Sequence, residues 1–175
     1  MDTSPLAGWE NFYVITGSCA GGLIGLTFVV IALLTELQKV KLHGLRAFVT
    51  PTIVHFAAVL SLSAYFSMPH QTLLTLGVGL ALGGLAGLIY GGMIWFHMAQ
   101  TRSDYTPVRE DWAWHVFAPI VAYGAMLASA IALHTHGAAA LFSIGLIALS
   151  LLLIGIHNAW DIAVHVTLAR RSDTN

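Results

Sequence analysis

The sequence predicts an all-α integral membrane bundle of five transmembrane helices, forming a single transmembrane domain over residues 1–175. The chain is 57% hydrophobic and only 9% charged, whereas a soluble domain carries about 25% charged residues. Five apolar stretches each reach the ~20 residues needed to cross ~30 Å of hydrocarbon, the second only with its flanking residues. Glycine recurs every four residues in the central stretch, as it does where membrane helices pack closely.

The first predicted helix covers residues 9–35. Glu10 and Glu36 stand at its two ends, where we interpret them as solvated end residues. No signal peptide is expected, because the first eight residues contain no Lys or Arg and no small-residue cleavage site follows a short apolar core. Three aromatic residues anchor its entry into the bilayer: Trp9, Phe12 and Tyr13. Small residues repeat along one face of this helix: Gly17, Gly21 and Gly25.

This segment, WENFYVITGSCAGGLIGLTFVVIALLTE, resembles the N-terminal helix of a family of short, uncharacterised bacterial multi-spanning membrane proteins. The resemblance covers one helix of five, and it implies no activity and no functional residue. Residues 17–21, Gly-Ser-Cys-Ala-Gly, have the letters of a nucleophile elbow. Such an elbow needs a strand entering a sharp turn, whereas these residues lie in a helical run of small residues, which indicates packing.

The second and third helices are predicted at residues 50–67 and 72–98, and Thr50-Pro51 reads as a helix start. In the third helix four glycines share one narrow face. An interior glycine costs a helix in water ~1 kcal/mol relative to alanine, but a bilayer tolerates it because the backbone has no better partner. These four glycines are Gly79, Gly83, Gly87 and Gly91. We expect the glycine faces of the first and third helices to pack against other helices and to support a homo-oligomer.

The fourth and fifth helices are predicted at residues 112–133 and 138–168. Thr106-Pro107 resembles the start at Thr50-Pro51, and Pro119 predicts a kink. GSCAGGLIGL from Gly17 and GLALGGLAGL from Gly79 both fit GxxxGGLxGL. A duplicated hairpin would explain this, but the rest of the two hairpins does not match, which favours chance in Gly/Leu-rich segments.

The basic residues predict the orientation. All seven lie in the first connection, the third connection or the tail: Lys39, Lys41, Arg46, Arg102, Arg109, Arg170 and Arg171. The positive-inside rule then places the N-terminus outside and the C-terminus in the cytoplasm, and an even number of helices would break this pattern. A single cysteine excludes a disulfide framework, and a net charge of −1 argues against a nucleic-acid partner.

Nine histidines carry most of the functional signal. Three fall in the two outer turns, where we consider metal binding only a weak hypothesis: His70, His134 and His136. The other six lie toward the cytoplasmic side, and five of them belong to four predicted helices. They are His43 in the first connection, His55, His97, His115, His157 and His165.

The fifth helix sharpens this prediction. His157, Asp161 and His165 are spaced i, i+4 and i+8, so they share one face, with Asn158 beside them. An ionisable residue deep in a membrane helix is a functional-site hypothesis by default. Imidazoles with a carboxylate suit a divalent transition metal or a proton relay, because histidine titrates near neutral pH. The candidate ligand or relay residues are His157, Asp161, His165, Asn158, His55, His97 and His115, with the first three as metal ligands.

The sequence leaves other interpretations open. Four tryptophans mark the same boundary, so the histidines would also fit a membrane interface without a ligand: Trp95, Trp112, Trp114 and Trp160. The leading function is a channel or carrier for protons, metal or another small ion in a bacterial inner membrane. Alternatives are a redox subunit binding metal or haem b, for instance through His55 and His157, and a ligand-free structural or regulatory partner. The sequence contains no HExxH, GxxxxGK[ST] or Rossmann pattern, so it assigns no enzymatic activity.

Overall fold

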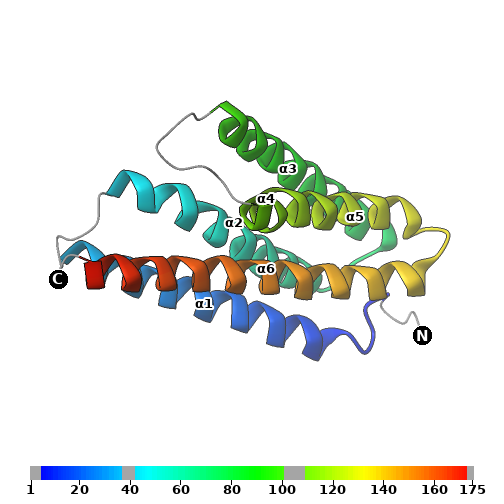
Figure 1. The fold of residues 1–175 in the computed structure, drawn as a ribbon. Helices are drawn as coiled ribbons and strands as arrows, with labels where there is room; N and C mark the ends of the chain where they lie inside the picture. Colours follow the sequence, from blue (N-terminus) through cyan, green and yellow to red (C-terminus); the bar gives the residue numbers. More distant parts are fainter. Residues whose placement is uncertain (1–4, 37–41, 101–108, 173–175) are drawn as a thin grey trace.

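The computed structural model describes residues 5–36, 42–100 and 109–172, with side chains except at 34–48, 111 and 165–172. These ranges are helical and contain no strand, which confirms the all-α prediction. Five helices are long and apolar enough to cross a membrane. The elements, in chain order, are α1 (Glu10–Glu36), α2 (Leu42–Phe66), α3 (Leu73–Gln100), α4 (Arg109–Trp112), the π-helical turn η1 (Ala113–Phe117), α5 (Ala118–Ala132) and α6 (Gly137–Ser172) (Figure 1).

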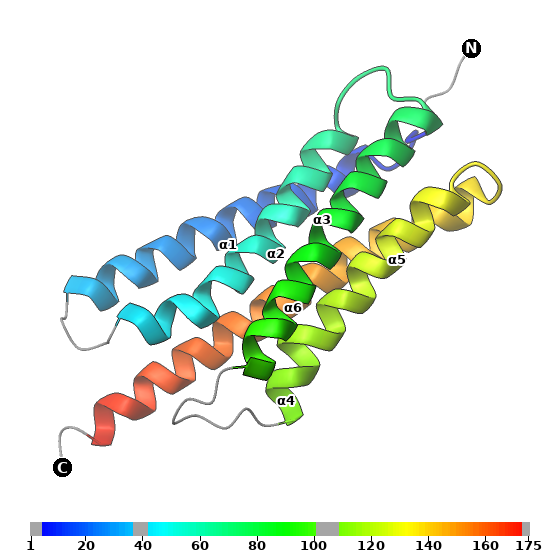
Figure 2. The ribbon, with the colours of Figure 1, turned by 90° about the horizontal axis from the view of Figure 1, so that it is seen from above.

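The long helices run up and down the bundle. Figure 2 shows the turns after α2 and α5 at one end, which we call the turn end. The last residues of α1, α3 and α6 and the first of α2 and α4 lie toward the opposite end, the C-terminal end. The helix ends that flank residues 37–41 and 101–108 therefore lie toward the same end of the bundle. Residue 46, predicted in the first connection, and residues 170 and 171, predicted in the tail, belong instead to α2 and α6.

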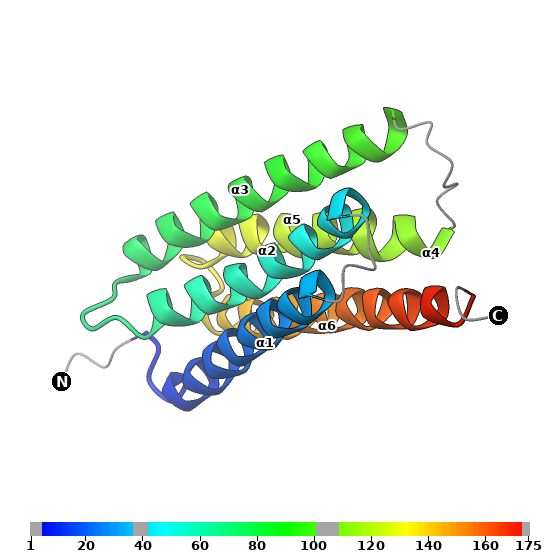
Figure 3. The same ribbon diagram turned by 90° about the vertical axis from the view of Figure 1, so that its left-hand side faces the viewer.

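Helix α6 lies at the centre of the packing. It contacts α2 and α5, while α1 packs mainly on α2 and α3 mainly on α5. Helices α2 and α3 diverge from their shared turn (Figure 3) and touch each other much less. Residues from four helices are completely buried between them, among them Phe56, Leu80, Tyr123 and Leu151.

The outer surface of the bundle is apolar. Large side chains on α1, α3 and α6 are more than half exposed, including Leu26, Leu82 and Leu153. A monomeric soluble protein rarely exposes large continuous patches of this kind, whereas a bilayer presents hydrocarbon that suits them. The exposed apolar helices are those expected of a membrane protein.

Helix α2 begins earlier than expected. The predicted start was Thr50-Pro51, but α2 begins at Leu42 and carries Pro51 within it. The apolar span alone, Val49–Phe66, begins near the predicted position. Proline removes one backbone donor from a helix, and a membrane helix tolerates this when its neighbours accommodate the turn. The other predicted start, Thr106-Pro107, lies outside the described residues.

A π-helical turn precedes Pro119, and the kink predicted at this proline stays a prediction. Pro119 has no N–H to donate to the carbonyl oxygen of His115, four residues earlier. The N–H of Ala118 bonds instead to the carbonyl oxygen of Ala113, five residues back. One-turn π-bulges often occur at functional sites, because they rotate the residues around them out of the regular helical register. This turn contains Trp114 and His115.

Candidate functional site

The glycine face of α3 packs on two different helices. Gly87 and Gly91 are buried, and a Cβ at these positions would overlap the Tyr123 ring and Ile120 of α5, respectively. Gly79 faces the ring of Tyr65 on α2 instead. At Gly83 a Cβ would be in ordinary contact with the sulfur of Met126, at 3.5 Å.

A further glycine, which the four-residue spacing did not single out, packs directly against the backbone of α5. A Cβ at Gly84 would lie 2.9 Å from the backbone nitrogen of Leu127. Gly84 lies three residues from Gly87 and seven from Gly91, which is the spacing of one helical face. The contact between α3 and α5 thus uses glycines within one chain, and self-association through these helices stays a prediction.

The first helix uses only part of its glycine face. A Cβ at Gly17 would lie 2.9 Å from the Cβ of Ser63 on α2, and one at Gly21 would lie 4.0 Å from Leu60. Nothing lies within 4 Å of the corresponding position at Gly25. Nearby, the hydroxyl groups of Thr16 and Ser63 form a buried hydrogen bond of 3.0 Å.

The centre of the candidate site is a buried histidine–tyrosine pair. His55 on α2 is 1% exposed, and its Nδ1 lies 3.0 Å from Oη of Tyr123 on α5. The tautomer of the ring decides which of the two atoms donates. The other ring nitrogen, Nε2, is buried and has no hydrogen-bond partner among the described residues. A buried polar atom left without a partner costs about 1–3 kcal/mol, so this arrangement needs an explanation beyond packing.

The π-helical turn contacts α6. His115 in the turn is buried. The preceding residue, Trp114, stacks on the ring of His157 in α6, with ring centroids 4.1 Å apart and an angle of 27° between the planes. The turn therefore brings an aromatic ring against the imidazole of His157 on α6.

His157 and Asp161, which were predicted to share one face of the last helix, are close to each other. Nε2 of His157 lies 3.2 Å from Oδ2 of Asp161, and the two side chains are 25% and 45% exposed. The same Nε2 does not meet the geometry of a hydrogen bond, so we describe it as a close contact rather than an aligned hydrogen bond. Asn158 beside it is completely buried, and neither atom of its amide group finds a partner in the described ranges.

Two further candidates lie toward the C-terminal end of the bundle. His97 is exposed near the end of α3, and the side chain of His165 lies outside the described residues. The described part of the chain contains no group of three or more His, Cys, Asp or Glu residues that could hold a metal ion. The metal site proposed from His157, Asp161 and His165 therefore stays a prediction.

The histidines of the turn end are exposed. They are His70, His134 and His136. Nδ1 of His136 lies 2.9 Å from Oγ1 of the neighbouring Thr135, which is a local contact. His70 has a positive φ of 59° in the turn between α2 and α3.

Sequence reasoning missed two aromatic contributors to the site. Tyr123 was hidden in an apolar run, and Trp114 was interpreted as an interfacial residue. A polar hydroxyl in the middle of an apolar helix was one available signal for Tyr123. No significant match links this chain to a protein-family model, a curated protein or a solved structure, so its function has to be inferred from the geometry described above.

Proposed function

We propose that this chain spans a bacterial inner membrane, with its N-terminus outside and its C-terminus in the cytoplasm, and that it conducts or carries protons. The observation that carries the proposal is the buried pair of His55 and Tyr123, in which Nε2 of His55 has no hydrogen-bond partner among the described residues. Histidine exchanges protons near neutral pH. Ionisable residues facing the interior of a membrane bundle commonly mark proton and ion pathways.

The proposed route starts near the C-terminal end. Asp161 is the most exposed member of the cluster and contacts His157. The Trp114 ring fixes the orientation of His157. From there the route passes His115 and reaches His55, which contacts Tyr123.

Each imidazole would accept a proton on one ring nitrogen and release one from the other. Where two side chains do not touch, a water molecule would bridge them. Asn158 supplies a buried donor and a buried acceptor on α6, and its amide group would hold such a water. This assigns a role to two polar groups whose burial is otherwise unfavourable.

The test is proton flux through vesicles that contain the purified protein. A potassium gradient with valinomycin supplies the driving voltage, and a pH-sensitive dye inside the vesicles reports proton entry. We expect the parent protein to exceed protein-free vesicles. His55→Gln keeps a polar side chain of similar length but cannot exchange protons, so flux should fall by about 10-fold or more, the scale of general acid–base contributions.

His136→Gln is the matched control, because His136 is exposed in a turn. It should match the parent. The proposal is wrong if the parent conducts no better than empty vesicles or if His55→Gln conducts as well as the parent. An absorbance spectrum near the Soret band, with metal analysis of the same sample, tests the alternative of a haem- or metal-binding subunit.

A further inference from the structure

Three aromatic rings meet on the outer surface of the bundle, toward its C-terminal end. They belong to Trp95 of α3, Trp112 of α4 and Phe117, the last residue of η1, and we call them the ring cluster. The ring of Trp95 makes edge contacts with both others, with ring centroids 5.9 Å from Trp112 and 5.5 Å from Phe117. The cluster remains open to its surroundings, because Trp95 is 43% and Phe117 is 48% exposed.

The π-helical turn brings two of these rings together. Trp112 and Phe117 are five residues apart, a spacing that places side chains on different faces of an α-helix. A π-helical turn closes its hydrogen bond over five residues instead of four, as the bond from the N–H of Ala118 to the carbonyl oxygen of Ala113 does here. The ring centroids of Trp112 and Phe117 consequently lie 6.4 Å apart. The irregular turn thus shapes an exposed surface of the bundle.

A positive charge lies next to the ring cluster. Arg109 is exposed and comes three residues before Trp112, so the two share one face of the helix. Helical side chains lean toward the N-terminus of their helix, which here directs the guanidinium group past the rings toward the end of the bundle. Arg109 forms no ion pair within the described part of the chain. Glu110, the next residue, lies roughly 100° around the helix axis.

The opposite side of the ring cluster, toward the middle of the bundle, is apolar. Val121 follows Phe117 by one helical turn on α5 and is 69% exposed. The surface therefore changes in character along the bundle, from a cation, through rings with polar N–H edges, to an exposed aliphatic side chain. A phospholipid has the same order of groups, from its phosphate through its ester oxygens to its acyl chains.

We propose that the ring cluster and Arg109 bind a phospholipid with a negatively charged headgroup. The lipid phosphate would pair with the guanidinium group of Arg109, a geometry that suits this side chain. An indole N–H of the cluster would donate to an ester carbonyl oxygen, at the depth that tryptophan prefers in a bilayer. An acyl chain would then lie along Phe117 and Val121.

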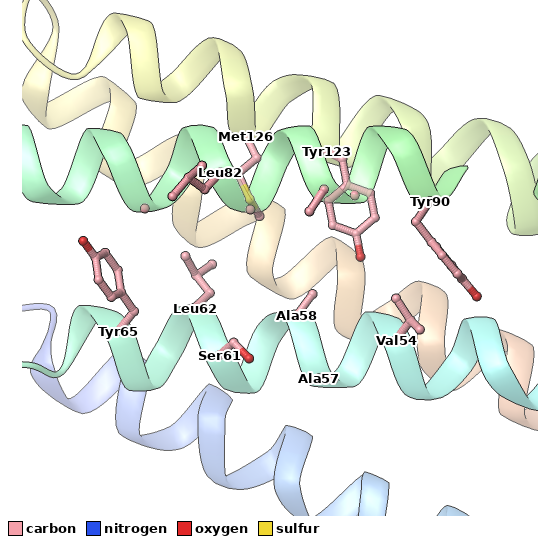
Figure 4. A pocket seen from close by; sticks show the side chains of 14 residues that line it. Val54, Ala57, Ala58, Ser61, Leu62, Tyr65, Leu82, Tyr90, Tyr123 and Met126 are labelled. Carbon is pink, nitrogen blue, oxygen red and sulfur yellow. The ribbon is translucent and has the colours of Figure 1, made fainter. Parts of the chain in front are cut away.

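The cavity between α2 and α3 lacks this combination of groups. It has a volume of about 530 Å³ and is lined largely by small and apolar residues such as Ala58, Gly83 and Met126 (Figure 4). None of the described residues that line it carries a charge. The hydroxyl of Tyr65, at one end of the cavity, already donates to the carbonyl oxygen of Thr75, at 2.6 Å. Charge and polar ring edges therefore favour the outer surface as the site that selects a lipid.

The experiment measures lipid binding by native mass spectrometry of the delipidated full chain in detergent. Dioleoyl phosphatidylglycerol is the probe, and dioleoyl phosphatidylcholine has the same chains without a net charge. Glycerol 3-phosphate has the phosphate without the chains. We expect saturable binding of phosphatidylglycerol, about 5-fold weaker binding of phosphatidylcholine and no binding of glycerol 3-phosphate. The proposal rests on the membrane location in the proposed function, but the measurement involves no proton flux, so either proposal can fail alone.

Four substitutions test the assigned roles. Arg109→Gln removes the charge, so affinity for phosphatidylglycerol should fall about 5-fold, to the level of phosphatidylcholine. Arg109→Lys keeps the charge and should retain the preference for phosphatidylglycerol. Trp95→Leu disrupts the ring cluster and should weaken binding of both lipids by about 5-fold. Trp160→Leu is the matched control, because Trp160 is 67% exposed on α6 and lies outside the ring cluster; it should bind like the parent.

Circular dichroism checks that each variant keeps its helical content. Binding of phosphatidylglycerol that weakens in Arg109→Gln and Trp95→Leu, but not in Trp160→Leu, supports the proposal. It is wrong if the parent binds no phosphatidylglycerol, binds both lipids equally well, or keeps its affinity in either Arg109→Gln or Trp95→Leu. An equal loss in Trp160→Leu would also contradict it. Dimers that form without lipid and dissociate in Trp95→Leu would overturn it by assigning this surface to a second copy of the chain.

Discussion

His55 and Asn158 are the residues whose burial is hardest to explain by packing alone. Each is at most 1% exposed, and between them three polar side-chain atoms lack a hydrogen-bond partner in the described residues. An apolar residue of similar size would fill either position without that desolvation cost. Their presence in the middle of a bundle therefore favours a site over a structural role.

Asp161 provides the most direct residue-level prediction. Asp161→Asn keeps the size of the side chain and removes the charge next to His157. We expect the protein to fold, because the substitution removes a desolvation cost together with a partner. Proton flux in the vesicle assay should nevertheless fall by about 10–100-fold, the scale of lost support for an imidazole.

Glu110→Gln is the control for Asp161→Asn. Glu110 is exposed on the short helix α4, near the same end of the bundle. Its substitution should leave flux unchanged. Equal flux in Asp161→Asn, Glu110→Gln and the parent would remove Asp161 from the proposed route and leave the contact with His157 as a feature of the helix surface.

At the level of the elements, α3 depends on α5. The two helices approach through Gly84, Gly87 and Gly91 of α3, where any Cβ would meet the backbone or side chains of α5. The opposite side of α3 exposes large apolar residues such as Leu85 and Ile89. In lipid, close van der Waals contact is the main attraction between apolar helices, so the bare face fixes where α3 can pack.

Gly87→Leu should separate α3 from α5. The new side chain would collide with the Tyr123 ring, and overpacking of this kind costs about 1–3 kcal/mol. Thermal or denaturant unfolding in detergent micelles, followed by circular dichroism, measures the loss of stability. Because Tyr123 contacts His55, proton flux should also fall.

Gly92→Leu is the companion variant for the unfolding experiment. It adds the same side chain to the same helix at a position with open space around it. Its stability should stay close to that of the parent. If both leucine variants unfold like the parent, the glycines of α3 do not form a contact that stabilises the bundle.

At the scale of the whole molecule, the bundle has two different ends. Helices α1, α3 and α6 end, and α2 and α4 begin, toward the C-terminal end. The two short turns lie at the turn end. Arg109, the basic residue with a described side chain, is exposed at the start of α4. Five long apolar helices are found among the described residues, and that they cross a membrane with the basic residues on one side stays a prediction.

Reporter fusions test the orientation that the positive-inside rule predicts. A reporter enzyme that is active only in the periplasm should be inactive when fused after Asn175. The same enzyme inserted in the turn at residues 68–71 should be active. The reverse pattern would invert the orientation and place the entrance of the proposed proton route on the outer side.

The sequence alone determined the number of helices and their approximate positions. Length and apolar character are local properties, and a stretch of ~20 apolar residues specifies a spanning helix without reference to the rest of the chain. The contact between His157 and Asp161 was also predictable, because residues four apart on a helix are neighbours. The π-helical turn before Pro119 was not predicted, because Pro119 indicated only a kink.

Only the tertiary structure decided which distant residues meet. His55 and Tyr123 are 68 residues apart in the chain, and their contact depends on how α2, α5 and α6 pack together. The same packing decided that Gly87 lies against a ring while Gly25 stays open, although both belong to similar repeats. The cavity between α2 and α3 has the same origin, because the divergence of two helices is set by the neighbours on which each one packs and not by the residues of either helix alone.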